Sequence, residues 1–503
     1  SNSINGGDGN DSIEVNSNSN TILGGAGEDH VTIAGSNNTV DGGADADNVT
    51  VSGNSNSLVS GSGADKISVS GGHNTIQSGD DADNITVSGS SNTVDAGTGD
   101  DNVTVSGNNN SLVSGSGADK ISVSGGHNTI QSGDDADSIT IAGSNNTVDG
   151  GAGDDNVTVS GNNNSLVSGS GADKISVSGG HNTIQSGDDA DSITIAGSNN
   201  TVDGGAGDDK ITVSSGTNNS INGGDGNDSI EVTANSNTIL GGDGDDRITI
   251  TGNRNTVDAG IGDNGVTVTT GGQNSIVAST GNDTVSLNSS TSDTVNAGDG
   301  NNKITVNGGD HNQITTGNDA DDITVSNTSH DNTIHAGNGA NNLTIAGYQN
   351  DVVSGNDADH ITVSGSDNTV NAGDGANVIT ISGSDNSVVA DGGDDSVTIS
   401  GDRNTVNAGN GANKITVDGG DRNQITTGND ADDITVSSGS SHNTINAGNG
   451  ANNITIDGDH NDVVSGSDAD NITVSGSDNT VNAGDGANVL TVSGGSNSIV
   501  SGS

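Results

Sequence analysis

The aliphatic residues of this chain recur in a unit of about eighteen residues. One copy of the unit runs over residues 146–163 and reads NTVDGGAGDDNVTVSGNN. Counted from its first Asn, positions three, twelve and fourteen are aliphatic, and position thirteen is usually Thr. Alternation of apolar and polar residues is typical of a strand with one buried face. We therefore expect one strand around positions eleven to fifteen and a shorter one around positions one to four.

A unit this short cannot bury a core alone, so successive units must stack and cover one another. The pattern predicts an all-β fold, a right-handed parallel β-solenoid (β-roll) with two parallel sheets and about 28 turns. We expect a single continuous β-solenoid over residues 1–503. The first residues, SNSINGGDGND, and the last, NSIVSGS, lie inside a repeat. We therefore interpret the chain as an internal segment of a longer repeat protein.

Charge excludes several kinds of partner. The chain has 10 Lys and Arg against 67 Asp and Glu, a formal net charge of −57. We expect no nucleic acid partner, because phosphate binding needs clustered Lys and Arg. We also expect no membrane insertion, because no stretch approaches the about 20 apolar residues of a span. Repulsion among the carboxylates strains a compact fold unless cations neutralise them, and calcium prefers oxygen ligands.

Positions five to ten of each unit form a turn rich in glycine, which we call the glycine turn. With the three residues that follow, it reads GGAGDDNVT at residues 150–158 and GGDGNDSIE at residues 223–231. Both match G-G-x-G-x-D-x-U-x, where U is aliphatic, so the chain resembles the repeats-in-toxin (RTX) family of calcium-binding parallel β-rolls. The resemblance implies calcium as cofactor, held by carbonyl oxygens of the turn and by the Asp carboxylate at position ten.

In the first half of the chain, position ten is Asp in every turn. A solvated acidic loop is the alternative interpretation, but such a loop does not need Asp at one constant position. The candidate metal ligands in this half are Asp11, Asp29, Asp47, Asp65, Asp83, Asp101, Asp119, Asp137, Asp155, Asp173, Asp191, Asp209, Asp228 and Asp246.

From Asn264 onward, position ten alternates between Asn and Asp. The Asp-bearing turns supply the candidate ligands Asp283, Asp321, Asp359, Asp395, Asp432 and Asp470. Four of these turns carry a second Asp at position eight, and we include it: Asp319, Asp357, Asp430 and Asp468. A carboxylate can bridge two ions, and an Asn side chain still offers a carbonyl oxygen. We therefore expect as many ions per turn as in the first half, bound more weakly.

The other half of each unit departs from the family pattern. It reads V-S-G-x-x-N-x-U-x, with Asn at position one, which we call the marker Asn, where the second calcium-binding Asp is expected. The marker is replaced once, by Asp293. We expect no calcium on this edge and a ladder of side-chain amides instead. One calcium edge per turn of about 18–19 residues is similar to long bacterial RTX adhesins.

Other candidate sites are weaker. His73, His127 and His181 are three turns apart, roughly 14 Å at the strand spacing, so they cannot share a transition metal and we interpret them as solvated loop residues. No unique Ser–His–Asp set is present, and we predict no enzyme activity. The Thr column at position thirteen is an alternative, because exposed hydroxyls at strand spacing could order water or contact ice.

Function must come from a surface that repeats along the chain. We predict a structural calcium-binding rod in a secreted bacterial surface protein, such as a fibre, an adhesin stalk or a surface layer. The predicted location is extracellular, secreted or on the cell surface, and the predicted partners are calcium ions and either further copies of the chain or other surface proteins. Alternatives are an ice-binding module that uses the Thr face and a non-catalytic RTX segment of a secreted enzyme or toxin.

Overall fold

The fold consists of β-strands joined by turns. The computed structural model describes residues 1–502, and these residues contain no helix. They form two compact units, unit 1 (Ser1–Arg247) and unit 2, which begins at Ile248. Each turn of the chain contributes to two parallel sheets, here sheets A and B, over about 28 turns. The predicted all-β parallel solenoid is thereby confirmed.

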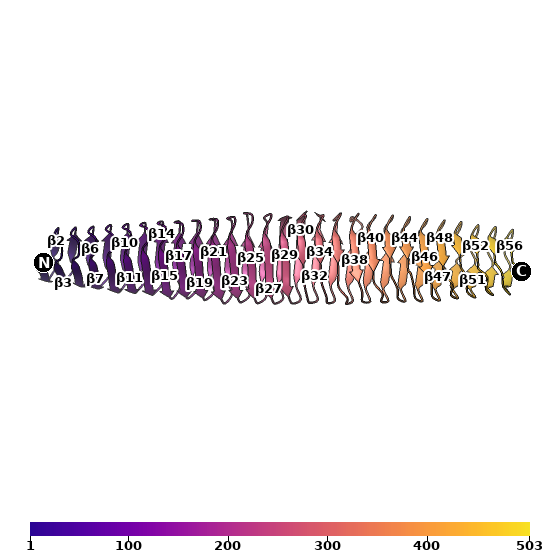
Figure 1. Ribbon diagram of the computed structural model, residues 1–503, viewed down its shortest axis with the longest axis horizontal. Coiled ribbons are helices and arrows are strands. Elements are labelled where there is room, and N and C mark those ends of the chain that lie inside the picture. Colours follow the sequence, from indigo (N-terminus) through magenta and orange to yellow (C-terminus); the bar gives the residue numbers. More distant parts are fainter. Residues whose placement is uncertain (503) are drawn as a thin grey trace. The chain divides into compact units, whose positions relative to one another are not determined.

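In unit 1 the strands of sheet A begin at position two and those of sheet B occupy positions eleven to fourteen (Figure 1). Sheet A contains β1 (Ser3–Asp8), β3 (Thr21–Ala26), β5 (Thr39–Ala44), β7 (Ser57–Ser62), β9 (Thr75–Asp80), β11 (Thr93–Thr98), β13 (Ser111–Ser116), β15 (Thr129–Asp134), β17 (Thr147–Ala152), β19 (Ser165–Ser170), β21 (Thr183–Asp188), β23 (Thr201–Ala206), β25 (Ser220–Asp225) and β27 (Thr238–Asp243). Sheet B contains β2 (Ser12–Val15), β4 (His30–Ile33), β6 (Asn48–Val51), β8 (Lys66–Val69), β10 (Asn84–Val87), β12 (Asn102–Val105), β14 (Lys120–Val123), β16 (Ser138–Ile141), β18 (Asn156–Val159), β20 (Lys174–Val177), β22 (Ser192–Ile195), β24 (Lys210–Val213) and β26 (Ser229–Val232).

Unit 2 repeats this plan, but most of its sheet A strands are shorter. Sheet A contains β29 (Thr256–Ile261), β31 (Ser275–Val277), β34 (Thr294–Asn296), β36 (Gln313–Thr315), β38 (Thr333–Gly337), β40 (Asp351–Ser354), β42 (Thr369–Asn371), β44 (Ser387–Val389), β46 (Thr405–Gly409), β48 (Gln424–Thr427), β50 (Thr444–Asn446), β52 (Asp462–Val464), β54 (Thr480–Asn482) and β56 (Ser498–Val500). Sheet B contains β28 (Arg247–Asn253), β30 (Gly265–Gly272), β32 (Thr284–Asn288), β33 (Ser290–Thr291), β35 (Lys303–Asn307), β37 (Asp322–Val325), β39 (Asn342–Ile345), β41 (His360–Val363), β43 (Val378–Ile381), β45 (Ser396–Ile399), β47 (Lys414–Val417), β49 (Asp433–Val436), β51 (Asn453–Ile456), β53 (Asn471–Val474) and β55 (Val489–Val492).

Pairing between turns is parallel and places equivalent residues opposite each other. In β18, Val157 pairs with Ile139 of the preceding turn and Ile175 of the following one. A residue type that recurs at one position therefore forms a column along the unit. The register converts the sequence period directly into columns of like side chains.

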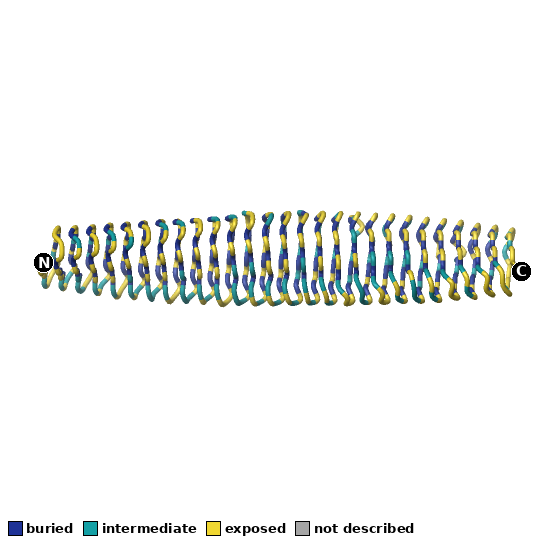
Figure 2. The backbone as a smooth tube through the Cα atoms, in the orientation of Figure 1, coloured by how far each residue is buried: buried dark blue, intermediate teal, exposed yellow. Residues whose placement is uncertain are grey.

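The core lies between the sheets and consists of the inward columns. Val148, Val157 and Val159 are 2%, 0% and 1% exposed, as the pattern predicted for positions three, twelve and fourteen. Position five adds a small inward residue that the pattern did not reveal, for example Ala96 or Ser60, both 0% exposed. Figure 2 shows buried and exposed residues alternating along the strands.

The backbone favours glycine at two positions, although position sixteen also holds Ser17 and Ala234. At position six of unit 1, φ is 98–125°, a region that side chains rarely adopt, and a Cβ on Gly151 would collide with the carbonyl oxygen of Gly133. At position sixteen, a Cβ on Gly161 would collide with the carbonyl oxygen of Gly143. The position-six glycines also let sheet A pairing continue to position seven in unit 1, so these strands are longer than predicted.

Position eighteen, just before the marker Asn, adopts the left-handed conformation with a residue other than glycine in nearly every turn. His73, His127 and His181 have φ of 58°, 59° and 58°. Asn, Asp and His tolerate this conformation better than β-branched residues do. The histidines noted in the sequence therefore lie at a loop position where the backbone is left-handed, which His tolerates.

Residues 1–502 contain no helix with the length and apolar character that crossing a membrane requires.

Candidate metal site along the glycine turn

The position-ten aspartates form an inward column at the end of each glycine turn. In unit 1, Asp137, Asp155 and Asp173 are each 2% exposed, immediately before the strands of sheet B. Oδ1 of Asp155 accepts the backbone N–H of Asp137 at 2.8 Å, and Oδ1 of Asp173 accepts that of Asp155 at 2.8 Å. One carboxylate oxygen of each Asp therefore joins its own turn to the preceding one.

The second carboxylate oxygen, Oδ2, is buried and has no hydrogen-bond donor. An ionised oxygen in this position is strongly destabilising unless a proton or a cation compensates it. The same orientation recurs in both units, at Asp11, Asp29, Asp47, Asp65, Asp83, Asp101, Asp119, Asp137, Asp155, Asp173, Asp191, Asp209, Asp228, Asp283, Asp321, Asp359, Asp395, Asp432 and Asp470. Asp246 also accepts the backbone N–H of the preceding turn, from Asp228 at 2.8 Å.

A backbone carbonyl oxygen of the next turn and the unpartnered Oδ2 both lie beside position five. A Cβ added to Gly42 would lie 2.6 Å from Oδ2 of Asp47 and would meet the carbonyl oxygen of Ser60 in the next turn. A Cβ on Gly150 would likewise lie 2.5 Å from Oδ2 of Asp155. A carboxylate oxygen and a backbone carbonyl from the next turn thus lie beside the same small residue.

This donor set fits calcium. Calcium takes six to eight oxygen ligands and accepts backbone carbonyls together with carboxylates. Nowhere in residues 1–502 do three or more Asp, Glu or His side chains gather to hold a metal ion. Backbone carbonyls of the glycine turns must therefore complete any cation site in this part of the chain.

Burial changes the acidity of the column. Burial raises the pKa of Asp155 to about 7, the hydrogen bond from the Asp137 backbone lowers it, and the charges of Asp137 and Asp173 raise it further. Asp101 and Asp209 have a pKa of about 7 for the same reasons. Without a cation, these carboxyl groups are therefore about half protonated at pH 7.

The position-eight aspartates lie elsewhere. Asp319, Asp357, Asp430 and Asp468 are exposed. Oδ2 of each accepts the backbone N–H of the position-eight glycine of the preceding turn, for example Gly300 to Asp319 at 2.9 Å. The structure thus places these side chains outside the inward column, and their role as calcium ligands stays a prediction.

The marker Asn column on the opposite edge forms the predicted ladder. Oδ1 of Asn182 accepts two hydrogen bonds from Asn164, one from the backbone N–H at 2.8 Å and one from Nδ2 at 3.2 Å. Nδ2 of Asn182 donates to the carbonyl oxygen of Gly161 at 3.1 Å. The amide therefore supplies the donor that the position-ten carboxylate lacks. The main cross-turn bond is from a backbone N–H, which sequence reasoning had not identified.

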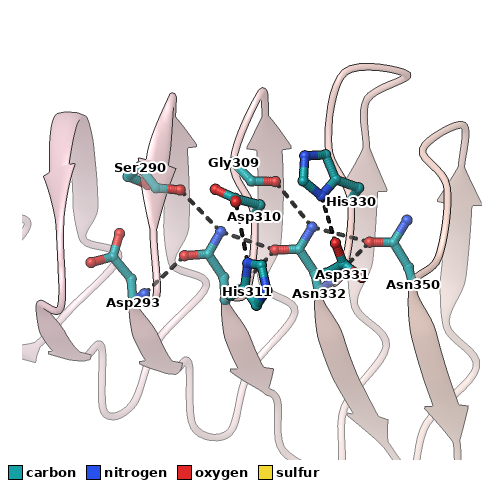
Figure 3. A network of polar contacts seen from close by, with 10 residues as sticks. Ser290, Asp293, Gly309, Asp310, His311, His330, Asp331, Asn332 and Asn350 are labelled. Carbon is teal, nitrogen blue, oxygen red and sulfur yellow. Dashed lines mark hydrogen bonds and ion pairs between the residues drawn. The ribbon is translucent and has the colours of Figure 1, made fainter.

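Figure 3 shows the ladder where Asp293 replaces the marker. Oδ1 of Asp293 accepts the Asn274 backbone N–H at 2.8 Å, and the Asp293 backbone N–H donates to Asn312 Oδ1 at 2.9 Å. Beyond it, Nδ2 of Asn332 donates to Oδ1 of Asn350 at 3.0 Å. An Asp thus occupies a ladder position with the same geometry as an Asn, and the two edges of the solenoid are built alike.

Comparison with known families assigns the repeats. The family described as RTX calcium-binding nonapeptide repeat (4 copies) matches residues 1–31, 34–67, 213–248, 222–257, 268–291, 345–379 and 464–499. The family described as Protein of unknown function (DUF3060) matches residues 69–126, 123–180 and 159–218. The chain therefore carries RTX calcium-binding repeats, and it is a calcium-binding β-roll.

No curated protein matches the sequence significantly. Among solved structures, the chain is similar to the X-ray crystal structure of a hyperactive, Ca²⁺-dependent, β-helical antifreeze protein from an Antarctic bacterium. The similarity covers 77% of this chain and 83% of that chain at 16% identity, with a TM-score of 0.17.

Proposed function

We propose that the position-ten aspartates are the calcium ligands and that the calcium-loaded solenoid is a structural rod of a secreted bacterial surface protein. The observation that supports the proposal is the column of buried carboxylate oxygens without a donor. The cation that such a column requires is supplied outside the cell, where calcium is abundant. Because the column needs calcium, we propose that the chain folds only after it has been secreted.

The two carboxylate oxygens of each position-ten Asp have different proposed roles. Oδ1 holds the register by accepting the backbone N–H of the preceding turn, as Asp155 does from Asp137. Oδ2 presents its charge to the ion, and a glycine at position five, as at Gly42 and Gly150, leaves room beside it. Bound calcium supplies positive charge and the remaining coordination sites, which lets turn carbonyls from neighbouring turns share one ion.

A structural role follows from the repetition of the surface. The described cavities are shallow and of modest volume; one of about 340 Å³ is lined by residues that include Ser292, Asp293 and His311. Neither matching family description names a catalytic activity. We therefore propose that the chain spaces or supports other parts of a surface protein, with further copies or other surface proteins as partners.

Circular dichroism of the full chain tests the proposal. Dialysis into calcium-free buffer at pH 7.5 should abolish most of the β-signal, because stacked buried carboxylates then repel one another. Millimolar calcium should restore the signal, whereas magnesium, which demands octahedral geometry at shorter distances, should restore it poorly. A β-spectrum that is unchanged by calcium removal would contradict the proposal.

The residues beside the Thr column favour a structural role for this face over ice binding. Thr305, Thr324, Thr344 and Thr362 lie at position thirteen of consecutive turns, paired in parallel. The neighbouring column at position eleven contains Lys303 and the charged Asp322, so the hydroxyl column is not flanked by a uniform flat surface. A thermal-hysteresis assay would detect ice binding directly.

A further inference from the structure

The alternation of Asn and Asp in unit 2 changes what each glycine turn needs. Position ten is Asn at Asn302, Asn341, Asn377 and Asn413, with an Asp turn between each pair. These Asn residues are 0–1% exposed, so they occupy the same inward column as the aspartates. The question is which atom of each amide faces the turn carbonyls.

The backbone determines how each amide is oriented. Oδ1 of Asn302 accepts the backbone N–H of Asp283 at 3.0 Å, and Oδ1 of Asn413 accepts that of Asp395 at 3.1 Å. A backbone N–H can only be satisfied by the amide oxygen, since Nδ2 has no acceptor capacity. The oxygen is therefore held by the stack, and the NH₂ group must point into the glycine turn.

There the NH₂ group binds the carbonyl oxygens of its own turn. Nδ2 of Asn302 donates to the carbonyl oxygens of Gly298 at 3.2 Å and Gly300 at 3.0 Å. Asn413 makes the same pair of bonds to Gly409 at 3.3 Å and Gly411 at 3.0 Å. In an Asp turn the atom at this place is the unpartnered Oδ2. A neutral donor thus replaces a carboxylate that needs a cation.

The backbone at position six of the Asn turns differs from that of unit 1. In six Asn turns the position-six glycine has φ of 63–74°, against 98–125° in unit 1, and these residues are Gly298, Gly337, Gly373, Gly409, Gly448 and Gly484. In the Asp turns of unit 2, Gly317, Gly355, Gly428 and Gly466 lie outside the positive-φ region at this position, whereas Ser279 and Asp391 have φ of 74° and 53°. These six Asn turns thus share one conformation at position six, and the hydrogen bonds of the Asn side chain close the turn.

We infer that the Asn turns of unit 2 bind no calcium, and that the side-chain amide closes these turns in place of the ion. This inference rests on the proposed calcium role of the position-ten aspartates. It departs from the expectation from sequence that every turn keeps its ion, which rested on bridging carboxylates and on a free Asn carbonyl oxygen. Unit 2 then alternates calcium turns with calcium-free turns, and its inward carboxylates are two turns apart.

Calcium counting on the full chain tests the inference. Equilibrium dialysis at millimolar calcium followed by elemental analysis should give about 20 ions per chain, one for each position-ten Asp. Filling the Asn turns as well would give about 27. A count near 27 overturns the inference, while a count near zero overturns the proposed calcium role itself.

A charge-matched pair of variants localises the effect. Asn302→Asp, Asn377→Asp and Asn413→Asp combined should add about three ions, because each creates an Oδ2 where Nδ2 stood. The control combines Asn296→Asp, Asn371→Asp and Asn407→Asp at position four of the same turns, where Oδ1 accepts the position-six glycine N–H at 3.2, 2.9 and 3.2 Å. These side chains lie outside the inward column, so the control should keep the wild-type count. Equal counts in both variants would overturn the inference.

Hydrogen exchange gives a readout that is independent of counting. With the wild-type chain kept folded at limiting calcium, a rise to saturating calcium should slow exchange at the Asp turn around Asp155 far more than at the Asn turn around Asn413. In the Asn413→Asp variant, exchange in that turn should become calcium-dependent. If calcium protects both turns equally in the wild-type chain, the inference fails although the calcium role stands. If it protects neither, the calcium role fails.

Discussion

Removal of one marker amide tests how the calcium-free edge is held. Asn182 is 2% exposed, and its Oδ1 accepts the backbone N–H of Asn164 at 2.8 Å. Asn182→Ala leaves this buried N–H without its acceptor and removes the donor to the carbonyl oxygen of Gly161. Nδ2 of Asn164 keeps its bond to Gly143 at 3.1 Å, so one backbone group and one carbonyl bear most of the loss. The expected cost is about 2–4 kcal/mol.

Hydrogen exchange on the calcium-loaded full chain measures this cost locally. A loss of about 2–4 kcal/mol lowers protection of the amides near Asn164 by roughly 30- to 800-fold if they exchange by local opening. Asn163→Gly is the matched control, because it removes an exposed amide group at a position with φ of 57°, which glycine tolerates. Equal exchange in the two variants would refute the ladder as a source of stability.

Four further outcomes are expected. Asp155→Asn should lower the calcium count by about one while its turn stays folded, as in the natural Asn turns; loss of several ions would contradict independent sites. In calcium-free buffer, the β-signal that is lost at pH 7.5 should return as the pH falls toward 5, since buried carboxyls with a pKa of about 6 to 7 contribute stability that is present below pH 4 and lost as the pH rises through those values. With calcium, affinity at such sites should instead fall by up to about tenfold per pH unit below the pKa, because protons compete; pH-independent binding would contradict this. Gly161→Ala should destabilise its turn by about 1–3 kcal/mol through collision with the Gly143 carbonyl, whereas the exposed Ser160→Ala should change the melting temperature little.

Much of the fold follows from the period of the sequence. Alternation at Val157 and Val159 placed the sheet B strand, and the constant spacing of Asp155 and its equivalents placed them in one column. In-register parallel stacking leaves little freedom once the repeat length is known. For this reason the inward aspartates and the marker ladder could both be predicted before the structure was available.

Atomic orientation could not be predicted in the same way. A sequence shows that Asn302 occupies the Asp column, but not that its oxygen is already taken by the Asp283 backbone. That depends on the exact register between turns, which decides whether an amide presents oxygen or nitrogen to the glycine turn. The left-handed backbone at position eighteen was also missed, although the histidines and the absence of β-branched residues there were a usable signal.

Anomalous scattering from crystals of the full chain grown in calcium tests the central claim most directly. Long-wavelength diffraction locates calcium ions without reference to the protein atoms. The structure predicts a row of peaks beside Oδ2 of the position-ten aspartates, one per turn in unit 1 and one for every second turn in unit 2, with none along the marker Asn edge. Peaks absent from the position-ten column, or gathered on the marker edge, would contradict the account.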